Sequence, residues 1–153
     1  MPDIRFRTTT IDDIATITHH RNRMFADMNV GTIDSRAQMD VHFKTWLHEE
    51  IINGHYLGWF ACDGDAVIAG AGIWLMNSSP VPDGFAGRVP YLLDVYTEPD
   101  YRKQGLARKL VTQSIDYCRE HGYPKMRLHA SVYGRPLYEQ LGFVDGNEMQ
   151  LTL

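Results

Sequence analysis

The sequence lacks the features that would point to a membrane, a secretory pathway or nucleic acid. No run of about 18 apolar residues is present, and a membrane-spanning helix needs one. Residues 1–7 lack the apolar segment of a signal peptide. Lysine and arginine total 15 against 19 acidic residues, and this net charge of −4 gives no basic surface for nucleic acid or anionic lipid. We therefore expect a cytoplasmic protein that binds neither nucleic acid nor membranes.

The sequence also has little that could form disulfides or bind a metal ion. Its two cysteines, Cys62 and Cys118, match no disulfide or zinc-binding spacing, so we expect two reduced thiols. Among the seven histidines, His48 begins a His-Glu-Glu-Ile-Ile run. An isoleucine, Ile52, stands where the zinc-binding helix motif requires its second histidine. We expect no metal site.

The composition is that of an ordinary globular protein. Of the 153 residues, 44% are hydrophobic and 22% are charged, which is enough apolar material for one core. The length fits one domain, and no repeat, low-complexity tract or linker interrupts the chain. We predict a single domain over residues 1–153.

Hydrophobic periodicity predicts an alternating series of strands and helices. The first half is expected to hold a strand at 4–8, a helix after Thr9 or Thr10, a helix after Asp34 or Ser35, and strands at 56–62 and 66–76. The second half is expected to hold strands at 89–97, 126–131 and 148–153 and helices at 104–120 and 136–140. Because a strand, a helix and a strand follow one another there, we expect at least one parallel crossover.

The junction between the 89–97 strand and the 104–120 helix has the chemistry of a phosphate site. A helix N-terminus presents unpaired N–H groups and a partial positive charge. Gly105 and Ala107 leave those groups open, and Arg102 and Lys103 add cationic donors. An ordinary strand-to-helix turn with solvated basic side chains explains the same residues equally well.

Two other phosphate-binding motifs do not fit this chain. The turn has no Gly-Lys-Ser/Thr ending, which excludes a P-loop. Gly70 and Gly72 begin a glycine pattern, but Leu75 occupies the position that the dinucleotide-binding fingerprint reserves for glycine or alanine.

Two segments resemble the GNAT superfamily of acetyl-CoA-dependent N-acetyltransferases. Residues 91–107 (YLLDVYTEPDYRKQGLA) are similar to the family's acetyl-CoA signature, and residues 128–131 (LHAS) with 137–143 (LYEQLGF) are similar to its next strand and helix. The resemblance implies an α/β (α+β) fold: a mixed, mostly antiparallel sheet of six to seven strands with helices on both faces. It also implies that the parallel strands at 91–97 and 126–131 splay apart.

The resemblance further implies how acetyl-CoA would bind. Backbone N–H groups of residues 104–109 would bind the pyrophosphate, residues 95–97 would pair with the pantetheine arm, and an N–H near Val95 would polarise the thioester. The implied acetyl-CoA residues are Val95, Tyr96, Thr97, Arg102, Lys103, Gln104, Gly105, Leu106, Ala107, Arg108, Lys109 and Ser131.

Catalysis in such a protein needs a proton acceptor for the amine and a proton donor for the departing thiolate. Tyr138 matches the family's general acid, although the residue alone would suit a packing role on a short helix. Asp94 is the ionised residue within the apolar strand, so it is a candidate base or a hydrogen-bonded structural carboxylate. Glu98, acting through water, and His129 are alternative bases.

The acceptor is expected to be a small-molecule or peptide primary amine. In related folds the first two helices border the acceptor site, so Arg21, Asp27 and Asn29 are candidate contacts, and the loop 77–88 is a candidate wall. Many relatives form dimers, so a homodimer is a further expectation. Two alternatives stay open: a non-catalytic acyl-CoA-binding sensor or partner domain, and an enzyme that uses a longer acyl-CoA.

Overall fold

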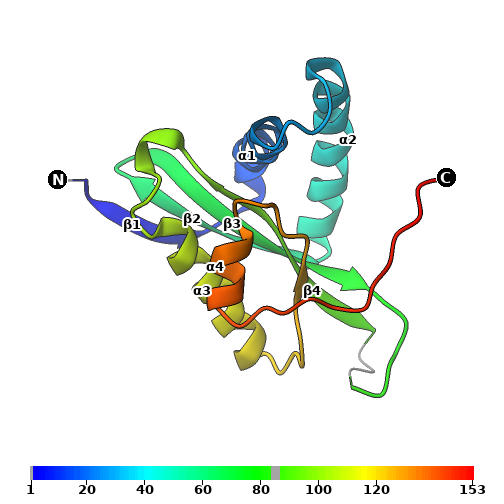
Figure 1. Ribbon diagram of the computed structural model, residues 1–153. Helices are drawn as coiled ribbons and strands as arrows, with labels where there is room; N and C mark the ends of the chain where they lie inside the picture. Colours follow the sequence, from blue (N-terminus) through cyan, green and yellow to red (C-terminus); the bar gives the residue numbers. More distant parts are fainter. Residues whose placement is uncertain (1, 84–86) are drawn as a thin grey trace.

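The computed structural model describes residues 2–83 and 87–153, and its central feature is a five-stranded sheet in the order β1-β2-β3-β4-β5 (Figure 1). The strands are β1 (Ile4–Thr8), β2 (Tyr56–Asp63), β3 (Ala66–Asn77), β4 (Arg88–Thr97) and β5 (Arg127–Leu128). Neighbours from β1 to β4 are antiparallel, whereas β5 runs parallel to β4. The predicted mixed, mostly antiparallel sheet is confirmed. The prediction of six to seven strands is wrong for the described residues, which form five.

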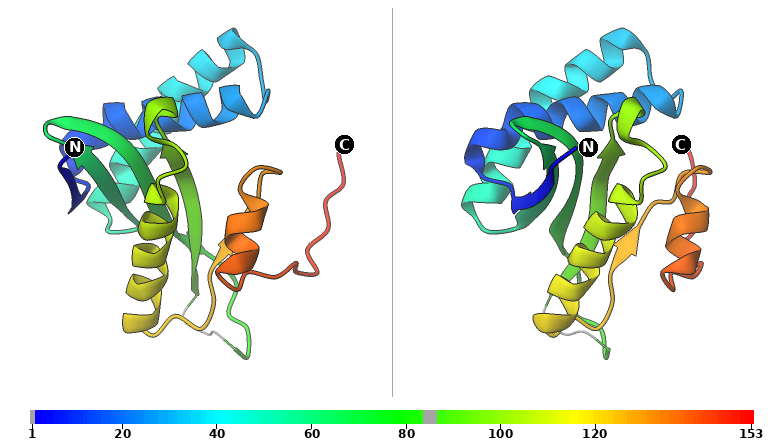
Figure 2. Two further views of the ribbon diagram at one scale, coloured as in Figure 1. Left: turned by 60° about the vertical axis from the view of Figure 1, so that its left-hand side comes forward. Right: turned by 90° about the vertical axis from the view of Figure 1, so that its left-hand side faces the viewer.

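Helices cover both faces of the sheet, as predicted (Figure 2). On one face lie α1 (Ile14–Asp27) and α2 (Ile33–Ile52), and on the other lie α3 (Leu106–Glu120) and α4 (Arg135–Gln140). Two short 3-10 helices, η1 (Ile11–Asp13) and η2 (Pro99–Tyr101), precede α1 and α3. No helix among residues 2–83 and 87–153 is long and apolar enough to cross a bilayer.

Each face of the sheet has its own apolar core. On one face, the fully buried Leu110 and Val111 of α3 pack against Ile68 and Leu92 of the sheet. These are the inward positions that the helical periodicity of residues 104–120 predicts. On the opposite face, Leu47 of α2 belongs to a second buried cluster with residues of α1 and β2. The sheet is therefore held between two helical layers.

Side-chain caps determine where the first two long helices begin. Thr10 and Asp13 form a capping box at η1, which leads into α1. Thr32 and Ser35 form a second capping box at α2. The predicted cap of α2 at Asp34 or Ser35 is thus wrong by a few residues, because the hydroxyl of Thr32 accepts from the Ser35 backbone N–H at 3.0 Å.

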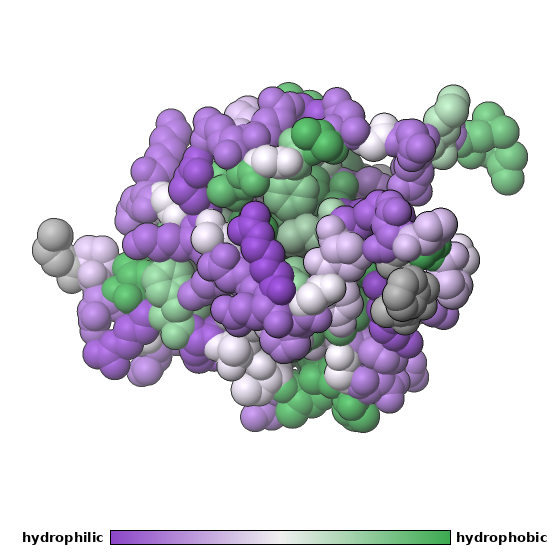
Figure 3. All heavy atoms as spheres, turned by 90° about the horizontal axis from the view of Figure 1, so that it is seen from below, coloured by the Kyte–Doolittle hydropathy of each residue, from purple (hydrophilic) through white to green (hydrophobic). Residues whose placement is uncertain are grey.

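The C-terminal segment differs most from the sequence-based expectation. Residues 148–153 are extended and exposed but pair with no strand in the described structure, so the predicted last strand is wrong. A strand requires a neighbour for its backbone groups, and alternating apolar residues alone cannot supply one. Figure 3 shows this tail projecting from the body and ending in apolar residues.

Candidate functional site

The site is a cavity at the point where β4 and β5 diverge. The two strands pair only at Tyr91 with Arg127 and at Leu92 with Leu128, although β4 continues to Thr97. This confirms the predicted splay of the parallel strands. The cavity has a volume of about 1510 Å³ and is lined by residues from α1, α2, β3, β4, α3, the segment after β5 and α4. Since a single small-molecule site usually occupies about 300–1,000 Å³, this cavity can hold two ligands together.

One end of the cavity is the N-terminus of α3. Gly105 precedes the helix with a left-handed φ of +79°, and Lys103 has a φ of +61°. The first N–H groups of a helix have no intrahelical partners, and no side chain of the described residues caps this end of α3. A Cβ built on Gly105 would meet no atom of the described residues within 4 Å, so the space beside this glycine is open. The helix start therefore has the form of an anion-binding site.

Most residues predicted to bind acetyl-CoA meet at this end of the cavity. Ten of them line it: Val95, Tyr96, Thr97, Arg102, Lys103, Gly105, Leu106, Ala107, Arg108 and Ser131. The cavity lining does not include Gln104 or Lys109. The ammonium of Lys109 lies 5.8 Å from the ring centroid of Phe6 instead.

An ion pair connects α1 to the loop before α3. Arg102 donates to the carboxylate of Asp27 at 2.7 Å and to the backbone oxygen of Thr97 at 2.9 Å. The hydrogen bond to Asp27 raises the pKa of the Arg102 guanidinium above its ordinary value. Two residues predicted for different ligands, one for acetyl-CoA and one for the acceptor, are thus bonded to each other. Both line the cavity.

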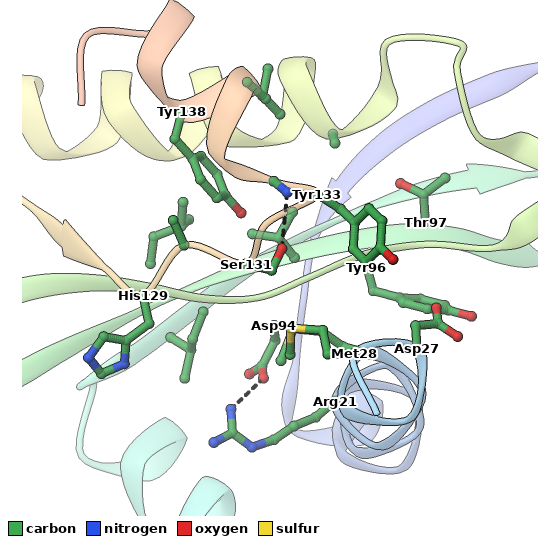
Figure 4. Close-up of a pocket in the computed structure, with 18 of the residues that line it drawn as sticks. Arg21, Asp27, Met28, Asp94, Tyr96, Thr97, His129, Ser131, Tyr133 and Tyr138 are labelled. Atoms are coloured by element: carbon green, nitrogen blue, oxygen red, sulfur yellow. Dashed lines mark hydrogen bonds and ion pairs between the residues drawn. The ribbon is translucent and has the colours of Figure 1, made fainter. Parts of the chain in front are cut away.

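A β-bulge places Asp94 at the centre of the site. Gly70 pairs with Tyr96 and Gly72 with Leu93, so Asp94 and Val95 together lie opposite the single residue between those glycines. Asp94 adopts a left-handed φ of +57°, which is unusual for a residue other than glycine. The bulge interrupts the β3–β4 ladder and turns this carboxylate toward α1 (Figure 4).

The Asp94 carboxylate is buried and bonded at both oxygens. Its side chain accepts from Arg21 at 2.8 Å and from the hydroxyl of Tyr56 at 3.1 Å. Burial raises the pKa of Asp94 above its ordinary value, while Arg21 and Tyr56 act in the opposite direction. Burial, together with Asp94, also raises the pKa of Tyr56 well above that of a free tyrosine. A buried carboxylate with a raised pKa suits a proton acceptor.

Tyr138 reaches the cavity from α4, on the opposite side of β4 from Arg21. In Figure 4 its hydroxyl points toward Ser131, whose own hydroxyl accepts from the Gly134 backbone N–H at 3.0 Å. A Cβ on Gly134 would lie 2.9 Å from the Tyr138 ring, so only glycine fits there without displacing the tyrosine. Burial raises the pKa of Tyr138, which keeps the hydroxyl protonated and able to donate.

Of the other candidate bases and acceptor contacts, some line the cavity and some do not. His129 lines the cavity, with its ring centroid 5.4 Å from that of Tyr91. Glu98 is not part of the lining, and its Oε1 lies 3.4 Å from Nε2 of His19. Arg21 lines the cavity, whereas Asn29 does not.

Three further expectations concern the loop, the thiols and metal ions. None of the described residues between β3 and β4 lines the cavity, and residues 84–86 of the loop 77–88 lie outside the described structure. Both cysteines are free and buried, and neither lines the cavity. The described residues contain no group of three potential metal ligands.

Sequence reasoning did not identify Tyr56 as part of the site. Tyr56 is the first residue of β2 and lies 38 residues before Asp94 in the chain. The alternation of side chains along β2 identifies it only as an inward-facing strand residue. The glycine at position 72 is the one available signal. A Cβ there would overlap the Tyr56 hydroxyl, so Gly72 makes room for it.

Comparison with known proteins agrees with this geometry. Residues 16–143 match the model of the acetyltransferase (GNAT) family. The chain belongs to the GNAT acetyltransferase family. A GCN5-related N-acetyltransferase from Ralstonia eutropha superposes with a TM-score of 0.91 at 28% identity, covering 98% of each chain. The structure of a predicted acetyltransferase with acetyl-CoA from Clostridium acetobutylicum has a TM-score of 0.89 at 26% identity, covering 98% of this chain and 96% of that one.

The curated relatives are matched over a shorter length. Glucosamine 6-phosphate N-acetyltransferase from Trypanosoma brucei brucei is 35% identical over 65 residues, which is 42% of this chain and 44% of that protein. The chain thus matches less than half the length of this relative.

Proposed function

We propose that this GNAT protein transfers an acetyl group from acetyl-CoA to a primary amine of a small molecule or peptide. The supporting observation is the continuous cavity that joins the open N-terminus of α3 to the buried Asp94 cluster through the splay of β4 and β5. One end suits a diphosphate and the other accommodates a second molecule. Direct attack of the amine in a ternary complex follows from this arrangement, with no covalent enzyme intermediate.

The residues at the start of α3 fit the diphosphate of acetyl-CoA. The N–H groups of residues 106–108 have no intrahelical partners, and the space above Gly105 is open. Lys103 and Arg108 line the same end and supply positive charge. Acetyl-CoA would supply the acetyl group as an activated thioester. The bulge at Asp94 and Val95 leaves backbone groups of β4 free to bind the thioester arm.

Two side chains would move the protons of the reaction. As the nitrogen–carbon bond forms and the carbon–sulfur bond breaks, Asp94 accepts the proton that the amine loses. Tyr138 donates its hydroxyl proton to the departing sulfur and regains one from solvent. Asp94 and Tyr138 both line the cavity and approach it from opposite sides of β4 (Figure 4). Arg21 and Tyr56 hold the carboxylate in place.

Thiol release tests the proposal against the alternative of a non-catalytic acyl-CoA sensor. The purified protein is incubated with acetyl-CoA and a panel of primary amines, and free CoA thiol is measured against a reaction without amine. Amine-dependent thiol release supports the transferase. Tight CoA binding without release for any amine would favour the sensor. Replacing acetyl-CoA with longer acyl-CoA donors in the same assay identifies the preferred donor.

The exposed C-terminal tail supports a homodimer. Met149, Leu151 and Leu153 alternate with polar residues and are exposed, as on a strand that lacks its neighbour. Pairing of this tail with a second copy would cover these side chains. Light scattering of the full chain and of a variant truncated after Gly146 tests this. A dimer mass that falls to a monomer mass on truncation supports the proposal, and a monomer at micromolar concentration in both contradicts it.

A further inference from the structure

Five aromatic side chains form a continuous series along the cavity, which we call the aromatic wall. Ring centroids lie 5.6 Å apart for Phe43 and Trp46, 5.3 Å for Trp46 and Trp74, 6.5 Å for Trp74 and Tyr91, and 5.4 Å for Tyr91 and His129. These are the spacings of interacting aromatic pairs. All five rings line the cavity, and they come from α2, β3, β4 and the segment after β5. Four separate elements thus build one π-rich surface.

The aromatic wall lies away from the α3 end of the cavity. Tyr91 is near the start of β4, whereas Thr97, beside the α3 N-terminus, ends that strand. Two methionines of the lining are next to the wall in the chain: Met39 lies one turn before Phe43 on α2, and Met76 lies two residues after Trp74 on β3. Thioethers are polarisable and pack well against ring edges. This part of the cavity therefore offers ring faces and sulfur to the second ligand.

The charges beside the aromatic wall are balanced. Arg21 pairs with Asp94 at 2.8 Å, and its guanidinium lies 4.7 Å from the ring centroid of Phe43. Arg127 and Glu148 also line the cavity and carry opposite charges. The negative charge of Glu148 contributes, after burial, to raising the pKa of Tyr91. Among the described residues that line this end, Arg21 and Arg127 are matched by Asp94 and Glu148, so they leave no excess positive charge to bind a phosphate group.

We propose that the acceptor is a primary amine carried on an aromatic body through a short linker. This inference rests on the proposed acetyltransferase function and specifies its substrate class. An aromatic ring would stack against the wall, while an amine held on a short linker would reach toward Asp94. A sugar phosphate would place most of its hydroxyls against ring faces and thioethers, which form no strong hydrogen bonds, and its dianion where the charges of Arg127 and Glu148 cancel. The acceptor of this chain therefore differs in class from that named for the trypanosomal relative.

Steady-state kinetics with amines of graded structure test the inference. Ethylamine and 2-phenylethylamine carry the same linker, and only the second has a ring. Burying one aromatic ring should raise kcat/KM by about 100-fold. Glucosamine 6-phosphate should react no faster than ethylamine. Equal kcat/KM for the two alkylamines, or a preference for the sugar phosphate, would overturn the inference.

A matched pair of tryptophan variants ties the preference to the wall. Trp74→Leu should lower the ratio of kcat/KM for 2-phenylethylamine over ethylamine by about tenfold, because one ring of the wall is lost. Trp59→Leu makes the same change in β2, where the indole packs near Tyr117 outside the cavity lining, and should leave the ratio unchanged. Equal ratios in Trp74→Leu and the wild type would contradict the role of the wall.

A binding measurement separates this inference from the proposed function. Two of the three tryptophans belong to the wall, so bound 2-phenylethylamine should change the intrinsic fluorescence, and Trp74→Leu should weaken that change. Saturable binding without thiol release would refute catalysis while supporting the aromatic site. Thiol release with aliphatic amines, without saturable binding of 2-phenylethylamine, would refute the aromatic site while supporting catalysis.

Discussion

Replacing Tyr56 with phenylalanine tests whether Asp94 is the proton acceptor. The Tyr56 hydroxyl donates to the Asp94 carboxylate at 3.1 Å and lies outside the cavity lining. The substitution therefore changes the pKa of Asp94 without removing a group that would touch a substrate. Tyr56→Phe keeps the ring that packs in the second core cluster, so the fold should be retained.

The size of the effect follows from this one hydrogen bond. A hydrogen bond to a charged group contributes about 1.5–3 kcal/mol, and it stabilises the ionised form of Asp94. Losing it raises the pKa of Asp94, so the carboxylate becomes protonated at a higher pH. Since about 1.4 kcal/mol corresponds to a tenfold change, the acid limb of kcat/KM should move upward by roughly one to two pH units. At a fixed pH below the limb, the variant is slower than the wild type.

The assay is the pH dependence of thiol release between pH 5 and 9, with thermal unfolding as a control for folding. Asp94→Asn serves as the companion variant, because asparagine also tolerates the left-handed φ of +57° at this position. It should lower kcat/KM by about 10²–10⁴-fold at neutral pH and abolish the acid limb. If the Tyr56→Phe profile superimposes on that of the wild type, Asp94 is not the base, and His129 becomes the leading candidate.

Two further variants test the acid and a buried histidine. Tyr138→Phe should reduce turnover by about 10²–10⁴-fold with acetyl-CoA affinity unchanged, and calorimetry together with thiol release checks this; an unchanged rate would assign Tyr138 to packing. Burial lowers the pKa of His20 from 6.5 to about 4, so the folded protein resists protonation of this ring and loses stability as pH falls from about 6.5 to 4. Relative to His20→Leu, the wild type should lose about 3 kcal/mol of unfolding free energy between pH 7 and 4, and parallel urea titrations that give a constant difference would refute this.

Local patterns in the sequence predicted most elements because each has a strong periodic signal. The inward face of α3, with Leu110 and Val111, follows from the helical periodicity of residues 104–120, and β2 and β3 follow from the strand patterns at 56–62 and 66–76. The tail at 148–153 shows the limit of that method. Its alternation resembles that of β1, but the described structure contains no strand beside it, and pairing cannot be derived from one segment alone.

The candidate site was predictable where it follows a continuous motif and not where it joins distant segments. Residues 95–97 and 102–109 were identified from one stretch of chain, and all of them except Gln104 and Lys109 line the cavity. The Arg21–Asp94 pair spans 73 positions and the Arg102–Asp27 pair spans 75, so neither contact leaves a local signal. The aromatic wall likewise appears only when four elements come together.

Calorimetric titration of CoA into Gly105→Glu tests the central claim, that the backbone N–H groups at the start of α3 bind the diphosphate. Gly122→Glu is the matched control, because Gly122 follows the other end of α3 with a similar left-handed φ of +75° and equally open space. Both variants carry the same backbone strain and the same added charge. We predict that Gly105→Glu abolishes CoA binding while Gly122→Glu binds like the wild type. Equal affinity in the two variants would contradict the diphosphate site.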